Sequence, residues 1–343
     1  GGSELVQLPA ARTADASFSG LLDADGRPVD DAWRARRRDA TLALFQRLRP
    51  RVLLLELFPF GRRALRFELL PLLDAAQAAQ PRPWVVVSLR DLLNPTAPEK
   101  AAWAVEVAER YVDRVLVHGD TQVAELPELF PEAQRLAERL RYTGYIAPDV
   151  PQGVPANGEV LVSTGGGAVA GPLAAAAVAA RPHARRLAQA TWRVLIGPNL
   201  PQQQFDRLAA QAAPGTIVER SRGDFLTLLA GCRVSVSQAG YNTMTEVLAA
   251  GVPAVAVPFA GGGREREQPL RAHRLAARGR LQVVDEDAVT PEALAAAADR
   301  ADAVGAGPAH RLDLDGRDNS VEIVGQLAAT LPPQQGGGPS NVS

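Results

Sequence analysis

The sequence has one cysteine, Cys232, and one lysine, Lys100, among its 37 basic residues. A lone cysteine excludes an internal disulfide and a zinc cluster of thiolates, and it is typical of a reducing cytoplasm. The scarcity of lysine excludes chemistry that needs a lysine anywhere but at position 100. Methionine occurs only at Met244, and the chain opens on Gly1 and Gly2, so we interpret it as a piece of a longer product.

Long apolar runs are also lacking. The longest, residues 173–180, is far shorter than the roughly 20 residues that a membrane helix needs, and no basic and then apolar leader opens the chain. A net charge of −1 gives no reason to expect nucleic acid as a partner. The 343 residues, 46% of them hydrophobic, are enough for two domains, and we expect a soluble cytoplasmic protein.

Short apolar runs alternate with longer segments of helical spacing, the pattern of strand-helix units around a parallel sheet. In the first half, strands are predicted at residues 5–8, 52–57, 84–89, 114–118 and 140–143, and helices at residues 30–48, 65–79, 100–111 and 132–139. In the second half, strands are predicted at residues 159–163, 192–197, 216–218, 234–237, 254–257 and 281–284, each followed by a helix. The pattern predicts an α/β protein with two Rossmann-like, doubly wound domains facing each other across a cleft.

Residues 147–158 (APDVPQGVPANG) are rich in proline and glycine and have no periodicity, as expected of a linker. They divide the chain into a first domain at residues 1–146 and a second at residues 159–330. Residues 331–343 are too rich in proline, glycine and polar residues to pack, so we expect a disordered tail.

Ligands of open parallel sheets bind beyond the carboxyl ends of the strands. One loop at such an end consists of Ser163, Thr164, Gly165, Gly166 and Gly167. Its glycines let the backbone turn with aligned amides, and a helix start follows, which suits a phosphate or a sugar hydroxyl. The same glycines can equally serve only to close a strand-to-helix turn.

Two common nucleotide sites do not fit this glycine-rich loop. No Asp or Glu occurs in residues 160–205, so the acid that binds the ribose of NAD about 20 residues after the glycines is missing. A P-loop is excluded because no lysine follows the glycines.

The second loop, Ser237, Gln238 and then Gly240, precedes a helix predicted at residues 242–250. Asn242 or Thr243 is expected to cap this helix and, with its first amides, to meet a phosphate.

Further into the same helix, Glu246 can accept both hydroxyls of a ribose in charge-assisted hydrogen bonds. The simpler alternative is a solvated acid that interacts with the helix dipole. Past the next predicted strand, a polar, glycine-rich loop ends at Glu267 and Gln268, which are further candidates for ligand binding.

The order and spacing of these residues resemble the donor-nucleotide half of GT-B glycosyltransferases of family 28, the group that includes the N-acetylglucosaminyl transferase that completes lipid II. The resemblance spans roughly residues 160–303 and is carried by Ser237, Gly240, Thr243, Glu246, Gly251, Pro253, Pro258 and Gln268. It implies that Glu246 holds the ribose diol, that residues 240–243 hold the diphosphate, and that Gln268 contacts the donor hexose. The first-half motifs ELFPFGRR, SLRD, VHGD and YTGY resemble a bacterial branch of predicted glycosyltransferases.

Transferases of this group open with a strand and a glycine-rich loop that often carries the residue thought to deprotonate the acceptor. This chain begins near what corresponds to their second strand, so we expect the first domain to be incomplete at its start. The catalytic candidates that remain at predicted strand ends are Glu56, Asp91 and His118. Histidine titrates near neutrality and suits a base, although a structural histidine and an ion pair of Glu56 with Arg62 or Arg63 are alternatives.

Other charged patterns predict no further site. No histidine pair has metal-ligand spacing, so no metal site is predicted. The basic clusters at residues 34–38 and 62–66, beside Trp33 and Phe67, suit contact with anionic lipid. Such clusters are more often solvated helix faces.

The sequence as a whole favours an inverting, metal-independent glycosyltransferase that moves a hexose from a nucleoside diphosphate sugar to an acceptor hydroxyl. A UDP-sugar is the favoured co-substrate, and no other cofactor is expected. The acceptor is unknown; a lipid-linked acceptor would bring the protein to the inner face of the membrane. Two alternatives stay open: a non-hydrolysing nucleotide-sugar epimerase of the same architecture, and a catalytically inactive nucleotide-sugar-binding protein.

Overall fold

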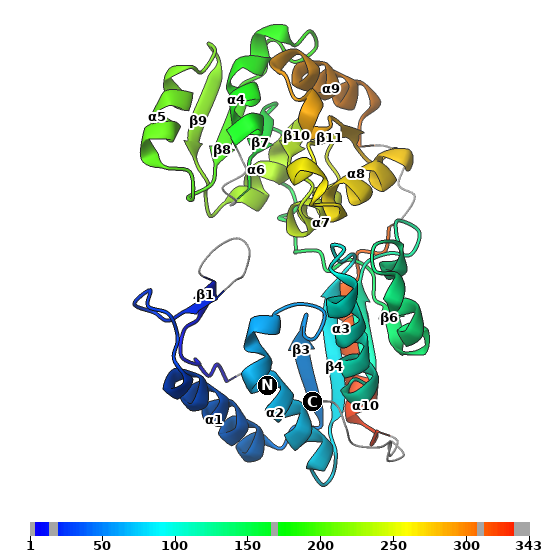
Figure 1. The fold of residues 1–343 in the computed structure, drawn as a ribbon. Helices are drawn as coiled ribbons and strands as arrows, with labels where there is room; N and C mark the ends of the chain where they lie inside the picture. The colour runs from blue at the N-terminus through cyan, green and yellow to red at the C-terminus, as the bar shows by residue number, and fades with distance from the viewer. Residues whose placement is uncertain (1–3, 14–19, 166–170, 307–311, 333–343) are drawn as a thin grey trace.

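The computed structural model describes residues 4–13, 20–165, 171–306 and 312–332. Two parallel sheets, each with helices packed on it, form the two halves of the molecule (Figure 1). The predicted α/β architecture of two parallel-sheet domains is therefore confirmed. Among the described residues, no helix is both long and apolar enough to cross a membrane.

The sheet of the first domain has the order β3-β4-β5-β6, and all its neighbours are parallel. Its strands are β3 (Val52–Glu56), β4 (Trp84–Arg90), β5 (Arg114–His118) and β6 (Leu140–Tyr142). Its helical segments are α1 (Asp31–Leu48), η1 (Arg63–Leu65), α2 (Arg66–Ala78), α3 (Pro98–Tyr111), η2 (Leu126–Glu128) and η3 (Pro131–Arg139). A short antiparallel pair, β1 (Arg12–Thr13) and β2 (Leu21–Leu22), stands beside them.

Local chemistry explains where several of these elements form. Four consecutive residues of β4, from Trp84 to Val87, are buried, as expected of a strand covered on both faces. Helix α1 begins after Asp30, whose carboxylate accepts a hydrogen bond from the Trp33 amide at 2.7 Å.

Two predictions in the first domain were wrong in detail. Residues 5–8 lie outside any sheet in the described structure, and Leu5 is 91% exposed. A short apolar run forms a strand only where a neighbouring strand pairs with it. Residues 131–139, predicted as an α-helix from residue 132, form the 3₁₀ segment η3 instead.

The second domain has six parallel strands in the order β12-β11-β10-β7-β8-β9. They are β7 (Val160–Ser163), β8 (Trp192–Ile196), β9 (Thr216–Arg220), β10 (Val234–Ser237), β11 (Ala254–Ala256) and β12 (Gln282–Val283). Its helical segments are α4 (Gly171–Ala180), η4 (Arg181–His183), α5 (Gln202–Ala210), α6 (Phe225–Gly231), α7 (Tyr241–Ala250), η5 (Gly261–Gly263), α8 (Glu267–Ala277), η6 (Glu286–Ala288) and α9 (Pro291–Val304). This sheet is doubly wound: the chain adds β8 and β9 on one side of β7, then places β10, β11 and β12 on the other.

The last helix, α10 (Gly316–Ala328), crosses back to the first domain. Ile323, Val324 and Leu327 pack against Trp84 and Val86 of β4, and Figure 1 shows α10 beside the first sheet. The predicted range 159–330 is therefore not one packed unit. An amphipathic helix after a loop carries no local signal that tells which of two cores it joins.

Candidate functional site

The second sheet reverses its strand order between β7 and β10, and ligands of open α/β sheets bind at such a reversal. The last residues of the two strands, Ser163 and Ser237, are register partners, so the loops that follow them lie side by side. A Cβ placed on Gly165 would lie 3.4 Å from Oε1 of Gln238. The two loops chosen from the sequence therefore form one crevice, which we call the switch-point crevice.

The first of these loops needs its glycine. Gly165 has φ +70°, a left-handed conformation that other residues adopt only with strain. Before it, Thr164 is fully buried, and its hydroxyl donates to the Leu195 carbonyl at 3.2 Å. The predicted donor-binding residues Gly166 and Gly167 lie outside the described residues.

Helix α7 begins at Tyr241, one residue earlier than predicted, after Gly240 as N-cap. No side chain caps it, so the expectation that Asn242 or Thr243 caps the helix was wrong: both lie inside its first turn. A helix start has N–H groups without partners in the helix. A Cβ on Gly240 would meet nothing within 4 Å, so the crevice is open there to an anion.

Glu246 lies between one and two turns into α7 and is partly buried. Burial raises the pKa of its carboxyl above the ordinary range. Within the described part of the chain, no hydrogen bond or ion pair engages this carboxylate. A desolvated, unpaired acid is costly, which makes it a candidate for ligand binding.

Gln268 and Glu267 are engaged at the start of α8. Oε1 of Gln268 accepts from the Phe259 amide at 3.1 Å, which leaves its NH₂ group to donate. Oε1 of Glu267 accepts from the Asn94 amide of the first domain at 2.7 Å. Burial raises the pKa of Glu267 to about 7, although nearby Arg271 opposes the shift. Glu267 thus lies at the contact between the domains.

The three catalytic candidates of the first domain have different surroundings. Asp91 is 2% exposed, and its two oxygens accept from Nε and Nη2 of Arg271, both at 2.6 Å. Nη1 of Arg271 also donates to the Ala239 carbonyl in the crevice loop at 2.8 Å. With both oxygens bound, Asp91 joins the domains and has no free oxygen for an acceptor proton.

His118 is buried at the end of β5, and burial lowers its pKa to about 4, so the ring is neutral near pH 7. Nδ1 lies 2.8 Å from Oγ1 of Thr143, and Nε2 lies 2.7 Å from Oγ of Ser88. The Thr143 hydroxyl is placed to donate to the Gly144 carbonyl at 3.0 Å. We therefore assign the proton to Nδ1, and Nε2 accepts from Ser88.

Glu56 ends β3, and its exposed carboxylate pairs with Arg62 at 2.5 Å. The ion pair named as an alternative in the sequence is therefore present. It leaves the carboxylate accessible, because about half or more of each side chain is exposed.

Tyr241 was missed by sequence reasoning. Its hydroxyl donates to the His118 carbonyl at 2.8 Å and accepts from the Ile146 amide at 3.2 Å, so the start of α7 is fastened to the first domain. Arg271 and Asn94 were missed as well. All three bind partners remote in the chain, so no local pattern signals their role. Of the predicted donor-binding residues, the structure gathers these around the crevice: Ser163, Thr164, Gly165, Ser237, Gln238, Gly240, Asn242, Thr243 and Glu246.

Comparison with known proteins agrees with this geometry. Residues 176–306 match the family described as the glycosyltransferase family 28 C-terminal domain. The search of curated proteins finds no match. Among solved structures, the calicheamicin glycosyltransferase CalG4 is similar, with a TM-score of 0.54, 18% identity, and coverage of 88% of this chain and 80% of that chain.

Two further structures are similar at comparable levels. MurG of Acinetobacter baumannii has a TM-score of 0.52 and 18% identity, with 89% of this chain and 83% of that chain covered. The spinosyn rhamnosyltransferase SpnG complexed with thymidine diphosphate has a TM-score of 0.50 and 15% identity, with 85% and 77% covered.

The protein therefore has the fold of GT-B glycosyltransferases. Within its second half, residues 176–306 match the C-terminal domain of glycosyltransferase family 28.

Proposed function

We propose that this protein transfers a hexose from a nucleoside diphosphate sugar to an acceptor hydroxyl, with inversion and without a metal ion. One observation carries the proposal: the switch-point crevice combines the Gly165 turn, the uncapped start of α7 and the unpartnered carboxylate of Glu246. Thymidine diphosphate in the SpnG complex supports a nucleoside diphosphate as the ligand. We keep UDP-sugars as the favoured donors.

The donor is positioned by complementary groups. The diphosphate lies against the first amides of α7, where the helix dipole favours negative charge. Glu246 accepts the ribose hydroxyls, and the NH₂ group of Gln268 donates to the hexose. The amides around Gly165 and Gly240 stabilise the charge that develops on the departing diphosphate, the role that a metal ion has in other transferases.

Transfer is a single displacement. The acceptor oxygen forms a bond to the anomeric carbon from the face opposite the diphosphate while the bond from that carbon to the diphosphate oxygen breaks. The configuration at the anomeric carbon therefore inverts. The proton of the acceptor hydroxyl passes to a base of the first domain, for which Glu56 and His118 are the candidates.

Substitution of Glu246 tests the donor site. Calorimetric titration with UDP, thymidine diphosphate and GDP identifies the tightest nucleotide for the unaltered chain. Glu246→Ala should weaken that nucleotide about tenfold to a hundredfold, because one or two charge-assisted hydrogen bonds of about 1.5–3 kcal/mol are lost.

The matched control is Glu292→Gln, which neutralises an exposed first-turn acid of α9 in the same domain. Equal nucleotide affinity in the Glu246 variant, the control and the unaltered chain would reject the ribose role. NMR of the nucleotide sugar incubated without acceptor addresses the epimerase alternative, since only an epimerase converts it.

A further inference from the structure

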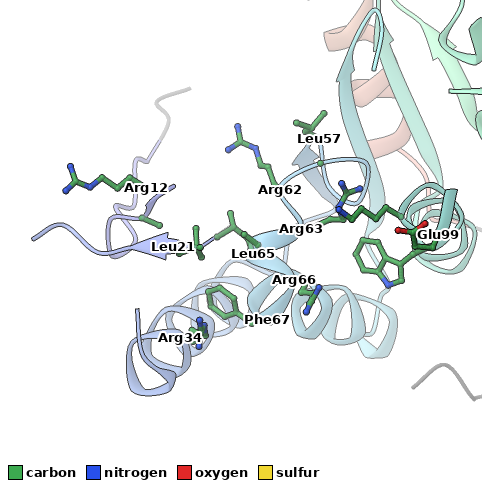
Figure 2. Close-up of a pocket in the computed structure, with 16 residues that line it drawn as sticks. Arg12, Leu21, Arg34, Leu57, Arg62, Arg63, Leu65, Arg66, Phe67 and Glu99 are labelled. Carbon is green, nitrogen blue, oxygen red and sulfur yellow. The ribbon is translucent and has the colours of Figure 1, made fainter. Parts of the chain in front are cut away.

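The first domain contains a cavity of about 1130 Å³ that neither the donor site nor the ion pairs between domains use. It is lined by residues of the β1–β2 pair, the segment between β3 and α2, the first turn of α2 and the first two turns of α3 (Figure 2). Because α2 follows β3 and α3 follows β4, these helix starts lie toward the carboxyl ends of the two strands, the edge of the sheet at which ligands of α/β domains bind. We call it the basic pocket.

The charge of the basic pocket is strongly one-sided. Its only acidic lining residue among the described residues is Glu99. Its basic lining residues are Arg12, Arg34, Arg62, Arg63, Arg66 and Lys100. The last of these is the only lysine of the chain.

Two of these cations lie at helix starts, where the helix dipole disfavours positive charge. Arg66 is the first residue of α2, and Lys100 lies in the first turn of α3. A helix start carries partial positive charge and favours acids, so each basic side chain there opposes the dipole. Each shares its first turn with an acid, Glu68 in α2 and Glu99 in α3. Both helix starts add to the positive potential of the pocket.

Two of the cations have acidic partners: Arg34 pairs with Asp31, and Arg62 pairs with Glu56. In the part of the chain that the structure describes, the side chains of Arg66 and Lys100 form no ion pair or hydrogen bond. Nη2 of Arg63 donates to Thr96 at 3.3 Å, while its Nη1 is buried without a partner. A buried, unsatisfied guanidinium nitrogen is costly and is expected to meet an acceptor atom from outside the protein.

Apolar side chains form the rest of the wall. Leu21, Leu57, Leu65, Phe67 and Trp103 line it. In Figure 2, Leu65 lies between Leu21 and Arg63, and Phe67 lies beside Arg34. A pocket with apolar walls and unpaired cations matches a molecule that has both an apolar body and an anionic group.

We propose that the basic pocket holds the acceptor, and that the acceptor is an anion, such as a phosphate ester, attached to an apolar body. The proposal rests on the proposed transferase function and adds the chemical class of its second substrate. Glu56, whose carboxylate binds the pocket residue Arg62, places a candidate base at the rim. An acceptor hydroxyl near the bound anion would thus lie beside this carboxylate.

The probe is hexyl phosphate, compared by calorimetry with inorganic phosphate, which lacks the apolar body, and with hexanol, which lacks the charge. Hexyl phosphate should bind at least tenfold more tightly than either, and its binding should weaken as salt increases. Equal binding of hexanol and hexyl phosphate would overturn the proposal.

Lys100 provides a local readout in the unaltered chain. Acetylation with an amine-reactive ester labels only the chain's one lysine and its terminal amine, and mass spectrometry separates the two. Hexyl phosphate should slow the acetylation of Lys100 at least threefold and leave the terminal amine unaffected. Unchanged labelling of Lys100 at saturating hexyl phosphate would place the ligand elsewhere and reject the pocket.

A double variant, Arg66→Gln with Lys100→Gln, removes two exposed cations of the pocket. It should weaken hexyl phosphate at least tenfold. The control, Arg36→Gln on α1, removes an exposed arginine that does not line the pocket and should leave the affinity unchanged. If the double variant and the Arg36 control lose equal affinity for hexyl phosphate, the binding depends on overall charge and the proposal is overturned.

These experiments distinguish a wrong acceptor class from a wrong transferase function. If hexyl phosphate does not bind but UDP binding depends on Glu246, only the acceptor class is rejected. If hexyl phosphate does bind, sedimentation with phosphatidylglycerol or phosphatidylcholine vesicles separates two sources of the anion. Pelleting with the anionic vesicles alone, lost in the double variant, assigns it to a membrane lipid; hexyl phosphate binding without pelleting assigns it to a dissolved acceptor.

Discussion

At the scale of single residues, the two candidate bases, Glu56 and His118, differ in their hydrogen-bond partners and in their exposure. Both ring nitrogens of His118 have hydroxyl partners, and the residue is only 7% exposed. Glu56 is exposed at the carboxyl end of β3 and borders the basic pocket through Arg62. A base must reach the proton that it removes. The geometry therefore favours Glu56 as the base and His118 as a residue that positions Ser88.

We expect Glu56→Gln to lower kcat by about 10²–10⁴-fold, the usual contribution of a general base. His118→Gln should have a smaller effect. Steady-state rates at saturating donor and acceptor are the measurement. The matched control is Glu109→Gln, because Glu109 is also paired with an arginine, Arg135, but lies near the C-terminal end of α3 and does not line the basic pocket. A larger loss in His118→Gln than in Glu56→Gln would reverse the assignment.

The sequence could predict those site residues whose role depends on near neighbours in the chain. Gly165, Gly240 and Glu246 belong to strand-turn-helix segments, whose residues are near neighbours in the sequence. The ion pair of Asp91 and Arg271 joins residues 180 positions apart, and either one alone resembles a surface charge. Its burial arises only when the domains meet, so the sequence could not show that Asp91 has a partner.

At the scale of elements, the sequence predicted most strands because a buried parallel strand is a short apolar run with turns at both ends. The prediction from sequence failed where contacts between distant segments determine whether a strand forms or where a helix packs. Residues 5–8 have the apolar pattern without a neighbouring strand, and α10 has a helical pattern that does not reveal its sheet. The start of α7 was off by one residue, and that changed the roles of Asn242 and Thr243 from caps to first-turn residues.

The turn between β7 and α4 gives a prediction at this scale. Gly165→Ala should destabilise the protein by about 1 kcal/mol, because alanine is strained at φ +70°. It should also weaken donor nucleotide binding, since the new methyl group would lie 3.4 Å from Gln238 in the switch-point crevice. Chemical denaturation and nucleotide titration measure the two effects.

Gly171→Ala is the control for that turn, because Gly171 begins α4, has no positive φ and has nothing within 4 Å of its Cβ position. It should leave nucleotide affinity unchanged. If the two alanine variants bind nucleotide equally well, the Gly165 turn does not shape the donor site.

At the scale of the whole molecule, the domain contact reaches the donor site directly. Arg271 binds Asp91 of the first domain and the carbonyl of Ala239, which lies between Gln238 and Gly240 in the crevice loop. Tyr241, the first residue of α7, binds the carbonyl of His118. Any change in the angle between the domains must therefore move the groups that we propose to hold the diphosphate.

The same contact predicts how stability varies with pH. Burial raises the pKa of Glu267 to about 7, above its value in the unfolded chain. The folded state therefore favours the protonated carboxyl. The stabilisation that results is complete below about pH 4.5 and is lost as pH rises through 7. At pH 8 the charged carboxylate remains at the interface, where it accepts from the Asn94 amide.

Glu267→Gln keeps an oxygen that can accept from Asn94 and removes the titration. Its free energy of unfolding should equal that of the unaltered chain near pH 4.5 and exceed it at pH 8 by on the order of 1–3 kcal/mol. Urea denaturation at half-unit steps from pH 4.5 to 8 measures the difference. Glu322→Gln removes the charge of an exposed residue of α10 and should leave the pH profile unchanged. A constant difference between Glu267→Gln and the unaltered chain across this range would show that Glu267 does not couple the proton to the domain contact.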